Sequence, residues 1–463
     1  MEFMIQLVAR QGSVEPVTTE LIRFEREALS MDTFGLALVE AKTLLGRLQL
    51  EMIRLQVDEH VGRARICRCG RKRRLKDNRM LPIRTAFGKL DVRDPRLHAC
   101  SCDAHAAGAR VLSPVRTALG QRVTPDLLHL ETRWASLVSF GVTRDLLADV
   151  LPLGEHFNAA TIRNDVMSVA KRLDSELGDE QSVFVDGCQE DWNELPIPDP
   201  PLTVGIDGGY VRSAKNRKVN FEVIVGKSVP ERGEVRRFGF TTGYDKKPRR
   251  RLYEVLRSQG LAMNQQVTFM SDGGDTVRKL QLHMSPNAEH LLDWFHLSMR
   301  LTVMTQQTKS LCAEFASLTE QSLGEIERVR HYLWHGNTDR AIDVIEDIQC
   351  QLDEVEKPPT ELRRLSRSIA DFVGYVLANA QMIPNYGDRW RHGEAVSTAF
   401  VESAVNQIVS KRFAKKQQMQ WSDAGAHLLL QTRTRVLDGT LGRDFKRWYP
   451  NAASTFQEVK LTA

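Results

Sequence analysis

Two short stretches of the sequence each carry an apolar run up to an aspartate that is followed by two glycines. They are TVGIDGGYV at 203–211 and TFMSDGGDTV at 268–277. In open α/β sheets, reactive groups collect where the carboxyl ends of strands open into a crevice. If the two strands are neighbours, the carboxylates of Asp207 and Asp272 converge there. The glycine pairs let the backbone turn sharply and let a bulky ligand approach.

Carboxylates that converge on one point favour a particular kind of metal ion. Their oxygens are hard ligands that suit Mg²⁺ or Mn²⁺ rather than zinc. Two such ions about 4 Å apart stabilise the attacking and leaving oxygens of an in-line phosphoryl displacement. A third acid is then needed, and we choose Glu402, because an acid within the apolar helical run AFVESAVNQIV costs stability unless it is paired or holds a cation. For either Asp-Gly stretch alone, an ordinary turn is the alternative.

Strand and helix patterns alternate around these aspartates. We expect strands at 203–207, 221–229, 235–243, 266–272 and 288–295, the last running into a helix, and helices at 248–259 and 276–284. Two hairpin-joined strands beside strands with helical crossovers predict a mixed sheet in an α/β domain. From 298 to 392 the pattern is almost wholly helical, and a further helix starts at 397.

Two cysteine pairs, Cys67/Cys69 and Cys100/Cys102, flank a stretch with strand character. Four thiolates on two knuckles joined by a hairpin make a tetrahedral zinc site, and a small module gains folding energy from that metal. The C-x-C spacing is shorter than the usual C-x2-C, and a histidine could replace one cysteine. The two histidines beside the second pair are His98 and His105. Four reduced cysteines beside a basic hairpin are the alternative.

Residues 124–173 predict three helices. The first begins with a threonine cap and a proline and ends at Gly141, the second has its own threonine cap, and the third begins at Asn158. A short helix, a turn and then a helix that starts in small polar residues is the helix-turn-helix pattern, although such helical hairpins also occur in structural domains. The residues that the last helix would offer to a DNA groove are Thr161, Arg163 and Asn164.

The charge distribution says more than the net charge of +5, which is too small to prove a polyanionic partner. Positive charge gathers in RKRR at 71–74, KKPRRR at 246–251 and KRFAKK at 411–416. Such clusters are expected of nucleic-acid binding, and each alone is also typical of a solvated surface. The residues of the last two clusters that we predict to bind DNA are Lys246, Lys247, Arg249, Arg250, Arg251, Lys411 and Arg412.

Composition excludes several classes of protein. A length of 463 residues suggests about three domains, and 42% hydrophobic with 27% charged residues is typical of soluble globular chains. No run approaches the roughly 18 apolar residues of a membrane span, and the N-terminus lacks the pattern of a secretory signal. Seven cysteines, four of them within 67–102, do not read as a secreted disulfide framework. We therefore expect a cytoplasmic protein without a membrane partner.

Four motifs, VGIDGGYV, FMSDGGD, LLDWFHLSMRL and AFVESAVNQIVSKRF, together resemble the DDE transposases of bacterial insertion sequences. The nearest match is the Kra-type group, which is related to the Mutator-like and hAT-like superfamilies, and the motifs lie within 200–435. The resemblance implies a ribonuclease-H-like catalytic domain interrupted by an all-helical insertion. It also implies that Asp207, Asp272 and Glu402 are the three catalytic acids. Asp275 follows the second acid by three residues and is a competitor for metal contact.

The resemblance also assigns DWFH at 293–296 to the family's Cys/Asp-x-x-His motif. Asp293 and His296 would then support the geometry of the active site or the handling of DNA ends, and Asn406, one turn after Glu402, is a further auxiliary candidate. The residues alone do not distinguish His296 from a core histidine. The main departure from the family is the C-x-C spacing.

The function that follows is a DNA transposase. Mg²⁺-activated water would cut a phosphodiester at an end of the element, and the 3′-hydroxyl so exposed would attack target DNA. The partners would be double-stranded DNA of the element ends and the target, and a second copy of the chain, because the reaction uses two ends; the location would be cytoplasmic and nucleoid-associated.

Three other functions compete with this one. A domesticated DNA-binding regulator that no longer cuts would not need all three acids. Another ribonuclease-H-like nuclease, such as a junction resolvase, would not need the helical insertion and two upstream modules. A metal-dependent phosphatase acting on small molecules leaves the basic clusters unexplained.

The proline-rich stretch ELPIPDPP at 194–201 reads as a linker, because it can continue neither a helix nor a central strand. The predicted organisation is a helical N-terminal segment (1–62), a zinc-ribbon-like module (63–112), a helix-turn-helix region (120–175), a linker (176–201), the first part of the ribonuclease-H-like core (202–297), an all-helical insertion (298–396), and the last part of the core with a C-terminal tail (397–463).

Overall fold

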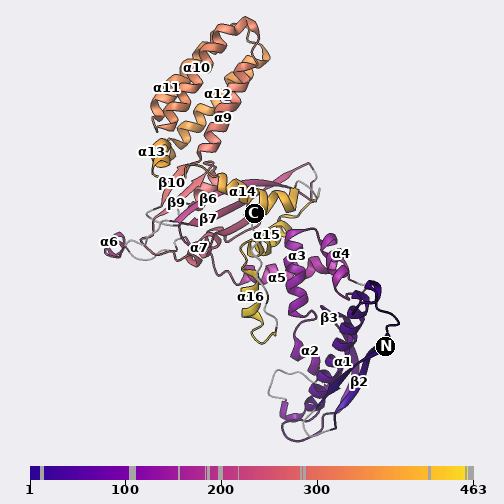
Figure 1. Ribbon diagram of the computed structural model, residues 1–463. Helices are drawn as coiled ribbons and strands as arrows, with labels where there is room; N and C mark the ends of the chain where they lie inside the picture. The colour runs from indigo at the N-terminus through magenta and orange to yellow at the C-terminus, as the bar shows by residue number, and fades with distance from the viewer. Residues whose placement is uncertain are drawn as a thin grey trace. The chain divides into compact units, whose positions relative to one another are not determined.

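The chain is mixed α/β in this computed structural model (Figure 1). The structure describes residues 1–10, 15–103, 111–154, 157–182, 184, 188–196, 202–216, 218–281, 284, 288–414, 419–453 and 456. Two compact units are present: unit 1 is Met1–Val169 with Gly439–Ala463, and unit 2 is Ala170–Asp438. No described helix combines the length and apolar character that crossing a lipid bilayer requires.

Unit 1 begins with a hairpin rather than the helix predicted for its first residues. Strands β1 (Glu2–Ala9) and β2 (Val17–Glu25) pair antiparallel, and helix α1 (Leu38–Ala64) follows the short turn η1 (Met31–Thr33). The helical segment predicted over 1–62 is therefore helical mainly from Leu38 onward. The run VTTELIRFE is rich in β-branched residues, which suit a pleated surface.

A second sheet follows α1 in unit 1. Strands β3 (Leu75–Thr85) and β4 (Gly88–His98) form a long hairpin, and the short strand β5 (Val111–Leu112) pairs with the end of β4. Helix α2 (Pro114–Leu119) comes next. The hairpin, α1 and α2 share a small apolar core of Val61, Leu81, Ile83, Val92 and Val115.

The three helices predicted at 124–173 are confirmed as α3 (Pro125–Leu137), α4 (Phe140–Val150) and α5 (Ala159–Ser175). The cap of α4 is Ser139, whose hydroxyl accepts the N–H of Val142, so Gly141 lies inside α4 instead of ending α3. The Asn158 side chain accepts the N–H of Thr161 at 2.9 Å, as a residue at the start of α5 should.

A buried ionic cluster joins β3, α3 and α5 within unit 1. Arg84 Nη1 lies 2.6 Å from the Asp165 carboxylate and 3.4 Å from that of Glu131. Burial, together with repulsion from Asp165, raises the pKa of Glu131 to about 9. Glu131 is therefore protonated at neutral pH, and the cluster keeps one negative charge for the one guanidinium. Helix α16 (Leu441–Trp448) contacts α3, with Phe445 edge-on to His129.

Unit 2 contains a five-stranded mixed sheet, which confirms the predicted α/β class. The strands are β6 (Leu202–Arg212), β7 (Asn220–Pro230), β8 (Arg236–Thr241), β9 (Val267–Ser271) and β10 (Glu289–Leu292), in the order β10-β9-β6-β7-β8. Strands β6, β7 and β8 pair antiparallel, whereas β9 and β10 run parallel to β6.

Helices cover both faces of this sheet. One face packs its apolar side chains against α7 (Pro248–Ser258) and α8 (Asp275–Gln281). The opposite face is covered by α14 (Ala399–Val405), the π-helix η5 (Asn406–Ala414) and α15 (Asp423–Leu437). Gly205 allows α14 to come this close, because a Cβ there would overlap Val401 and lie 2.9 Å from the Phe400 ring. The short helix α6 (Gln189–Asn193) precedes β6.

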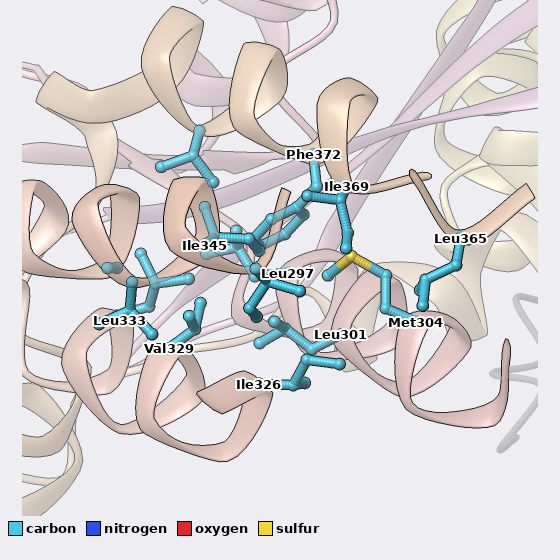
Figure 2. Close-up of a cluster of buried hydrophobic side chains, with 14 of the residues drawn as sticks. Leu297, Leu301, Met304, Ile326, Val329, Leu333, Ile345, Leu365, Ile369 and Phe372 are labelled. Atoms are coloured by element: carbon cyan, nitrogen blue, oxygen red, sulfur yellow. The ribbon is translucent and has the colours of Figure 1, made fainter. Parts of the chain in front are cut away.

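The stretch between β10 and α14 is helical, as its sequence pattern predicts. Helices α9 (Trp294–Lys309), α10 (Ala316–Trp334), α11 (Thr338–Asp353) and α12 (Thr360–Asn379) pack around a shared apolar core, with α13 (Tyr386–Arg391) and the short turns η3 (Ala313–Phe315) and η4 (Ala380–Met382) beside them. Figure 2 shows side chains from all four long helices meeting, among them Leu301, Val329, Ile345 and Phe372.

The close approach of α14 to the sheet predicts a large effect of one added methyl group. Gly205→Ala should lower the free energy of unfolding by about 1–3 kcal/mol, because the methyl must displace Val401 and Phe400. Gly324→Ala on α10 is the matched control, since nothing lies within 4 Å of its Cβ and alanine favours the helix. Urea unfolding of both variants tests this, and equal stability of the two would contradict it.

Candidate functional site

Three aspartates of unit 2 lie in one row across neighbouring parallel strands. Gly205 on β6 pairs with Met270 on β9, so two residues further on Asp207 is level with Asp272. Leu292 on β10 pairs with Ser271, so Asp293 is the next member of the same row. The N–H of Asp293 donates to the carbonyl of Ser271 at 2.8 Å, which continues the ladder. Parallel neighbours are about 4.8 Å apart, so the row concentrates three carboxyl groups.

The expectation that the strands of Asp207 and Asp272 are neighbours is thus confirmed, with one difference. Strand β6 does not end at Asp207 but continues to Arg212. Only the second glycine pair forms a turn, in which Gly273 adopts a φ of +82°. The first pair stays in the strand, where Gly209 lies against Val405 of α14.

Asp207 is half-buried, and no cationic side chain among the described residues donates a hydrogen bond to its carboxylate. Its Oδ1 accepts the N–H of Gly208 at 2.7 Å. Burial raises the pKa of Asp207, and the charges of Asp272 and Asp293 add to this, while the Gly208 N–H and His296 oppose it. A cation placed between the carboxylates would remove this penalty.

Asp272 is held by the turn that follows β9 and by the helical insertion. Its Oδ1 accepts the N–H of Gly274 at 3.0 Å, and the hydroxyl of Tyr375 on α12 donates to its carbonyl at 2.8 Å. A further carboxylate, Glu222 on β7, has a pKa raised by burial and by the charge of Asp272. Glu222 is therefore an additional acid of this site that the sequence analysis did not select.

Asp293 differs from its two neighbours because the protein satisfies its carboxylate completely. It is fully buried and caps α9 by accepting the N–H of Phe295 at 2.9 Å. It also accepts both the N–H and the hydroxyl of Thr398, and it bonds His296 Nδ1 at 2.7 Å. Burial alone would raise the pKa of Asp293, but these hydrogen bonds outweigh it and lower the pKa.

His296 is consequently an oriented imidazole rather than an ordinary core histidine. The hydrogen bond to Asp293 raises the pKa of His296, burial opposes this, and the negative charges of Asp207 and Asp272 raise it further. Because Nδ1 is committed to Asp293, Nε2 is the nitrogen left for a ligand or for another acid. The structure therefore joins Asp293 and His296 to the two open carboxylates.

Glu402 is positioned less directly. It is an exposed residue of α14, next to Val401, and α14 covers the sheet face from which Asp207 projects by strand alternation. The ligand oxygens of Asp207, Asp272 and Glu402 do not all lie within 4.8 Å of one another. Asn406 is exposed at the end of the same helix. The structure thus brings two of the three predicted acids together and places the third on the neighbouring helix.

The four cysteines of unit 1 form the compact cluster that the sequence predicts. The sulfurs of Cys67, Cys69, Cys100 and Cys102 all lie within 4.8 Å of one another. The separations are 3.7 Å between Cys69 and Cys100 and 3.9 Å between Cys100 and Cys102, too long for a disulfide. Four sulfurs about 2.3 Å from a tetrahedral zinc would lie about 3.8 Å apart, so the cluster fits that ion.

Histidine is not needed to complete this cluster, because all four positions are cysteines. His98 is exposed, and His105 lies outside the described residues. The C-x-C spacing does not prevent convergence, since the β3–β4 hairpin brings the two pairs to one end. The identity of a bound metal is an inference from the thiolate set.

A second group of possible metal ligands lies in unit 2 and consists of Asp174, Asp245 and His427. The guanidinium of Arg251 already occupies this group. Arg251 donates to Asp245 at 2.9 Å and to Asp174 at 2.7 Å. It also donates to Gln431 at 2.6 Å. This group is therefore an internal ion-pair network that ties α5, α7 and α15 together, and a metal there would compete with a buried guanidinium.

The predicted DNA-contacting residues of unit 1 are accessible. Arg163 and Asn164 are exposed on the first turns of α5, and Thr161 beside them is half-buried. The basic run at 71–74 is mostly exposed and lies between Cys69 and β3. Within this run, Arg73 is half-buried and donates to the carbonyls of Ala64 and Ile66, whereas the other three side chains are exposed to solvent.

The basic run at 246–251 in unit 2 is mainly structural, unlike our prediction. Lys246 is exposed, but Lys247 donates to the carbonyl of Gly178 at 2.6 Å and Arg250 to that of Leu177 at 3.1 Å. The side chain of Arg249 is half-buried. With Arg251 buried as well, this cluster fastens the start of α7 to the chain segment after α5.

The last basic cluster is likewise split. Lys411 is exposed, whereas Arg412 is fully buried, donates to the sulfur of Met419 and lies over the ring of Trp421. Burial lowers the pKa of Arg412 to about 9. Lys415 and Lys416 lie outside the described residues. Arg412 therefore does not present its charge to DNA.

No protein-family model matches the chain, and no curated protein matches it. Assignment of a function therefore depends on the residues and the geometry of these two sites.

Sequence reasoning missed three residues of the acidic site. Glu222 did carry a signal, because it is the one acid within the apolar strand FEVIV. Tyr375 and Thr398 gave none, since each reaches the row of aspartates from about 100 residues along the chain. Their roles depend on how the helical insertion returns to the sheet.

The dyad of Asp293 and His296 predicts a change in titration. Asp293→Asn should lower the pKa of His296, because it removes the negative partner that raises it. The raised pKa means that the His296 charge stabilises the fold at low pH and that this contribution is lost as pH rises through the folded-state pKa. NMR titration of the imidazole signals tests this, with Asp275→Asn as the control, and an unchanged His296 pKa in Asp293→Asn would contradict it.

The cysteine cluster predicts one bound metal per chain. Elemental analysis of the purified protein should find about one zinc per chain, and Cys100→Ser should lose most of it, because a three-sulfur site binds more weakly. Cys312→Ser is the control, as this free, exposed cysteine lies in unit 2. Zinc in equal amount in both variants would show that the cluster is not the site.

Proposed function

We propose that the chain is a DNA transposase that binds the ends of a mobile element and cuts and joins DNA with divalent metal ions. The single observation that carries this proposal is the row of Asp207, Asp272 and Asp293. Among the described contacts, no cationic side chain pairs with the carboxylate of Asp207 or Asp272, whereas hydrogen bonds satisfy that of Asp293. Repelling carboxylates that are kept side by side and partly exposed are typical of a cation site.

The donor set fits Mg²⁺ or Mn²⁺ better than zinc, because it offers carboxylate oxygens. Asp207 and Asp272 would hold such an ion, with Glu402 or Glu222 as the further acid. A bound ion would supply charge stabilisation for the attacking and leaving oxygens of a phosphodiester. The chain's own part is to position: Asp293 fixes His296, and the Gly274 N–H fixes the Asp272 carboxylate.

Two features of unit 2 agree with the ribonuclease-H-like architecture that the resemblance implies. One is the mixed sheet, with its antiparallel strands first and its parallel strands after them. The other is the all-helical insertion between β10 and α14, which contributes Tyr375 to the acidic site. Both features support the proposal through the arrangement of helices and strands. The ribonuclease-H-like fold is itself part of what we propose.

DNA binding is proposed for unit 1. Exposed Arg163 and Asn164 on α5 would enter a groove, and the basic run at 71–74 beside the cysteine cluster would contact phosphates. Among the described residues of the unit 2 clusters, the exposed Lys246 and Lys411 could add to this. We further propose a homo-oligomer acting on two DNA ends, in the cytoplasm at the nucleoid.

One observation favours a second candidate, a DNA-binding regulator that no longer cuts. Glu402 is exposed on α14 and does not share a tight cluster with Asp207 and Asp272. In a transposase this glutamate must approach the ion when substrate binds, or Glu222 must take its place. In a regulator it would have no such task.

A nicking assay on DNA that carries the ends of the element distinguishes the two candidates. Asp207→Asn and Asp272→Asn should each reduce Mg²⁺-dependent cleavage by at least about a thousandfold while leaving end binding within about twofold, because catalysis here consists of positioning and charge stabilisation. Glu402→Gln and Glu222→Gln identify the third acid by the same loss. Asp347→Asn is the control, since Asp347 is exposed on α11 of the helical insertion and outside the row.

Full cleavage by Asp207→Asn or Asp272→Asn would refute the assignment of the site. Absence of cleavage by the unaltered chain on cognate ends, with end binding intact, would favour the regulator.

A further inference from the structure

A cavity of about 750 Å³ lies in unit 2 at the edge strand of the sheet. Its walls come from β10, from α8, from the end of α12 and from the turn η4 that follows it. This volume lies in the usual range for small-molecule and cofactor sites. The cavity takes no part in the site described above, although the two share a boundary.

Among the described residues that line the cavity, one cationic side chain has no anionic hydrogen-bond partner. Glu289 is neutralised, because Arg389 donates to its two oxygens at 2.7 and 2.9 Å. Among the described residues, Arg278 on α8 donates to two neutral acceptors, the carbonyl of Ala378 at 3.2 Å and the side-chain oxygen of Asn379 at 2.6 Å. Its Nε is buried and has no hydrogen-bond partner within the part of the chain that the structure describes. Arginine carries five N–H donors, so a fixed fork with spare donors is available to an anion.

Arg278 is held in place by contacts that also reach the acidic site. Asn379 accepts from Arg278, is nearly fully buried, and donates to the carbonyl of Tyr375 at 2.8 Å. Its side-chain oxygen lies so close to Gly273 that a Cβ there would overlap it. Asn379, which lines the cavity, therefore also packs against the turn that Asp272 begins.

The remaining walls suit a flat, partly apolar group. Leu377, Met382 and Pro384 provide apolar surface, and Leu377 is 55% exposed at the rim although it is a large hydrophobic residue. His290 adds a polar edge, and its Nδ1 is occupied by Gln281 at 3.2 Å. An anion beside a flat group with polar edges is the chemistry of a nucleotide.

We propose that this cavity binds one nucleotide of the DNA strand that lies at the acidic site, with its phosphate on Arg278 and its base against Leu377 and Met382. The nucleotide assignment follows from the cavity itself, while its origin in a substrate strand rests on the proposed function. The adjoining Asp272–Gly274 turn is the reason to prefer a strand over a free nucleotide, since a strand held at Asp272 needs a place for its neighbouring unit.

The test is binding of a 5′-labelled single-stranded oligonucleotide to the full chain, by fluorescence anisotropy without added Mg²⁺ or Mn²⁺. Arg278→Gln should weaken binding about tenfold, as expected for loss of a charge-assisted hydrogen bond. It should also reduce the slope of log affinity against log salt by about 0.7, the value for one phosphate of a single strand. Arg363→Gln is the matched control, because Arg363 is exposed on α12.

A second variant covers the case in which loss of the Arg278–Asn379 bond disturbs folding. Leu377→Ala removes apolar surface against which the base would pack, at an already exposed position of α12, and should weaken binding without changing the salt slope. Competition by dAMP separates the two sources of the nucleotide. Arg278-dependent binding of dAMP together with Arg278-independent binding of the oligonucleotide would overturn the assignment to a strand. Independence of both probes from Arg278 and Leu377 would overturn the site itself.

These results are distinct from a failure of the proposed function, because binding is measured without chemistry. If the unaltered chain does not cleave DNA but binds the oligonucleotide through Arg278, the transposase proposal fails and the subsite remains. If Asp207→Asn abolishes cleavage and Arg278→Gln binds like the unaltered chain, the subsite fails and the transposase proposal remains.

Discussion

Repulsion between carboxylates that share one row of a parallel sheet is the constraint on which unit 2 depends. The fold sets Asp207, Asp272 and Asp293 side by side and then neutralises only one of them with hydrogen bonds, from His296 and from both donors of Thr398. The carboxylate of Asp207 keeps an unfavourable energy, because burial and the charges of Asp272 and Asp293 raise its pKa. Such a cost persists where a ligand removes it, and a divalent cation is the simplest ligand that can.

Two parts of unit 2 pack beside the row of aspartates, helix α14 on one side and the helical insertion on the other. Gly205 and Gly209 remove side chains so that α14 can press against the sheet and close one side, and Glu402 is carried on that helix. The helical insertion provides the other side, where Tyr375 holds the backbone of Asp272. A helical domain inserted between β10 and α14 is therefore part of the site as well as an addition to it.

Most of unit 2 could be predicted because its signals are local. Apolar runs, turn residues and helical spacing located all five strands, and the glycine pairs pointed to Asp207 and Asp272. What could not be predicted depends on contacts between distant residues. Nothing near Arg251 or Arg412 shows that buried acids or an aromatic ring take up their charge, so both read as DNA contacts. The N-terminal hairpin was missed because later leucines dominated the helical pattern of 1–62.

The cysteine cluster differs from the basic clusters, because here an atypical sequence pattern led to a correct prediction of which side chains meet. Its spacing was atypical, yet the four sulfurs converge, because the length of the β3–β4 hairpin and not the local motif sets their separation. The same reasoning explains the row of aspartates, in which the pairing register of three strands aligns residues that are 65 and 21 positions apart. In both sites, pairing between strands decides which side chains meet.

Direct titration of Mn²⁺ into the full chain, followed by electron paramagnetic resonance, tests the central claim that Asp207 and Asp272 share a divalent cation. Mn²⁺ should bind saturably to the unaltered chain, and this binding should be lost in the Asp207→Asn, Asp272→Asn double variant and kept in Asp347→Asn, whose substitution lies on the exposed surface of α11. Unchanged Mn²⁺ binding by the double variant would contradict it, and so would a chain that binds no Mn²⁺ while its fold is intact.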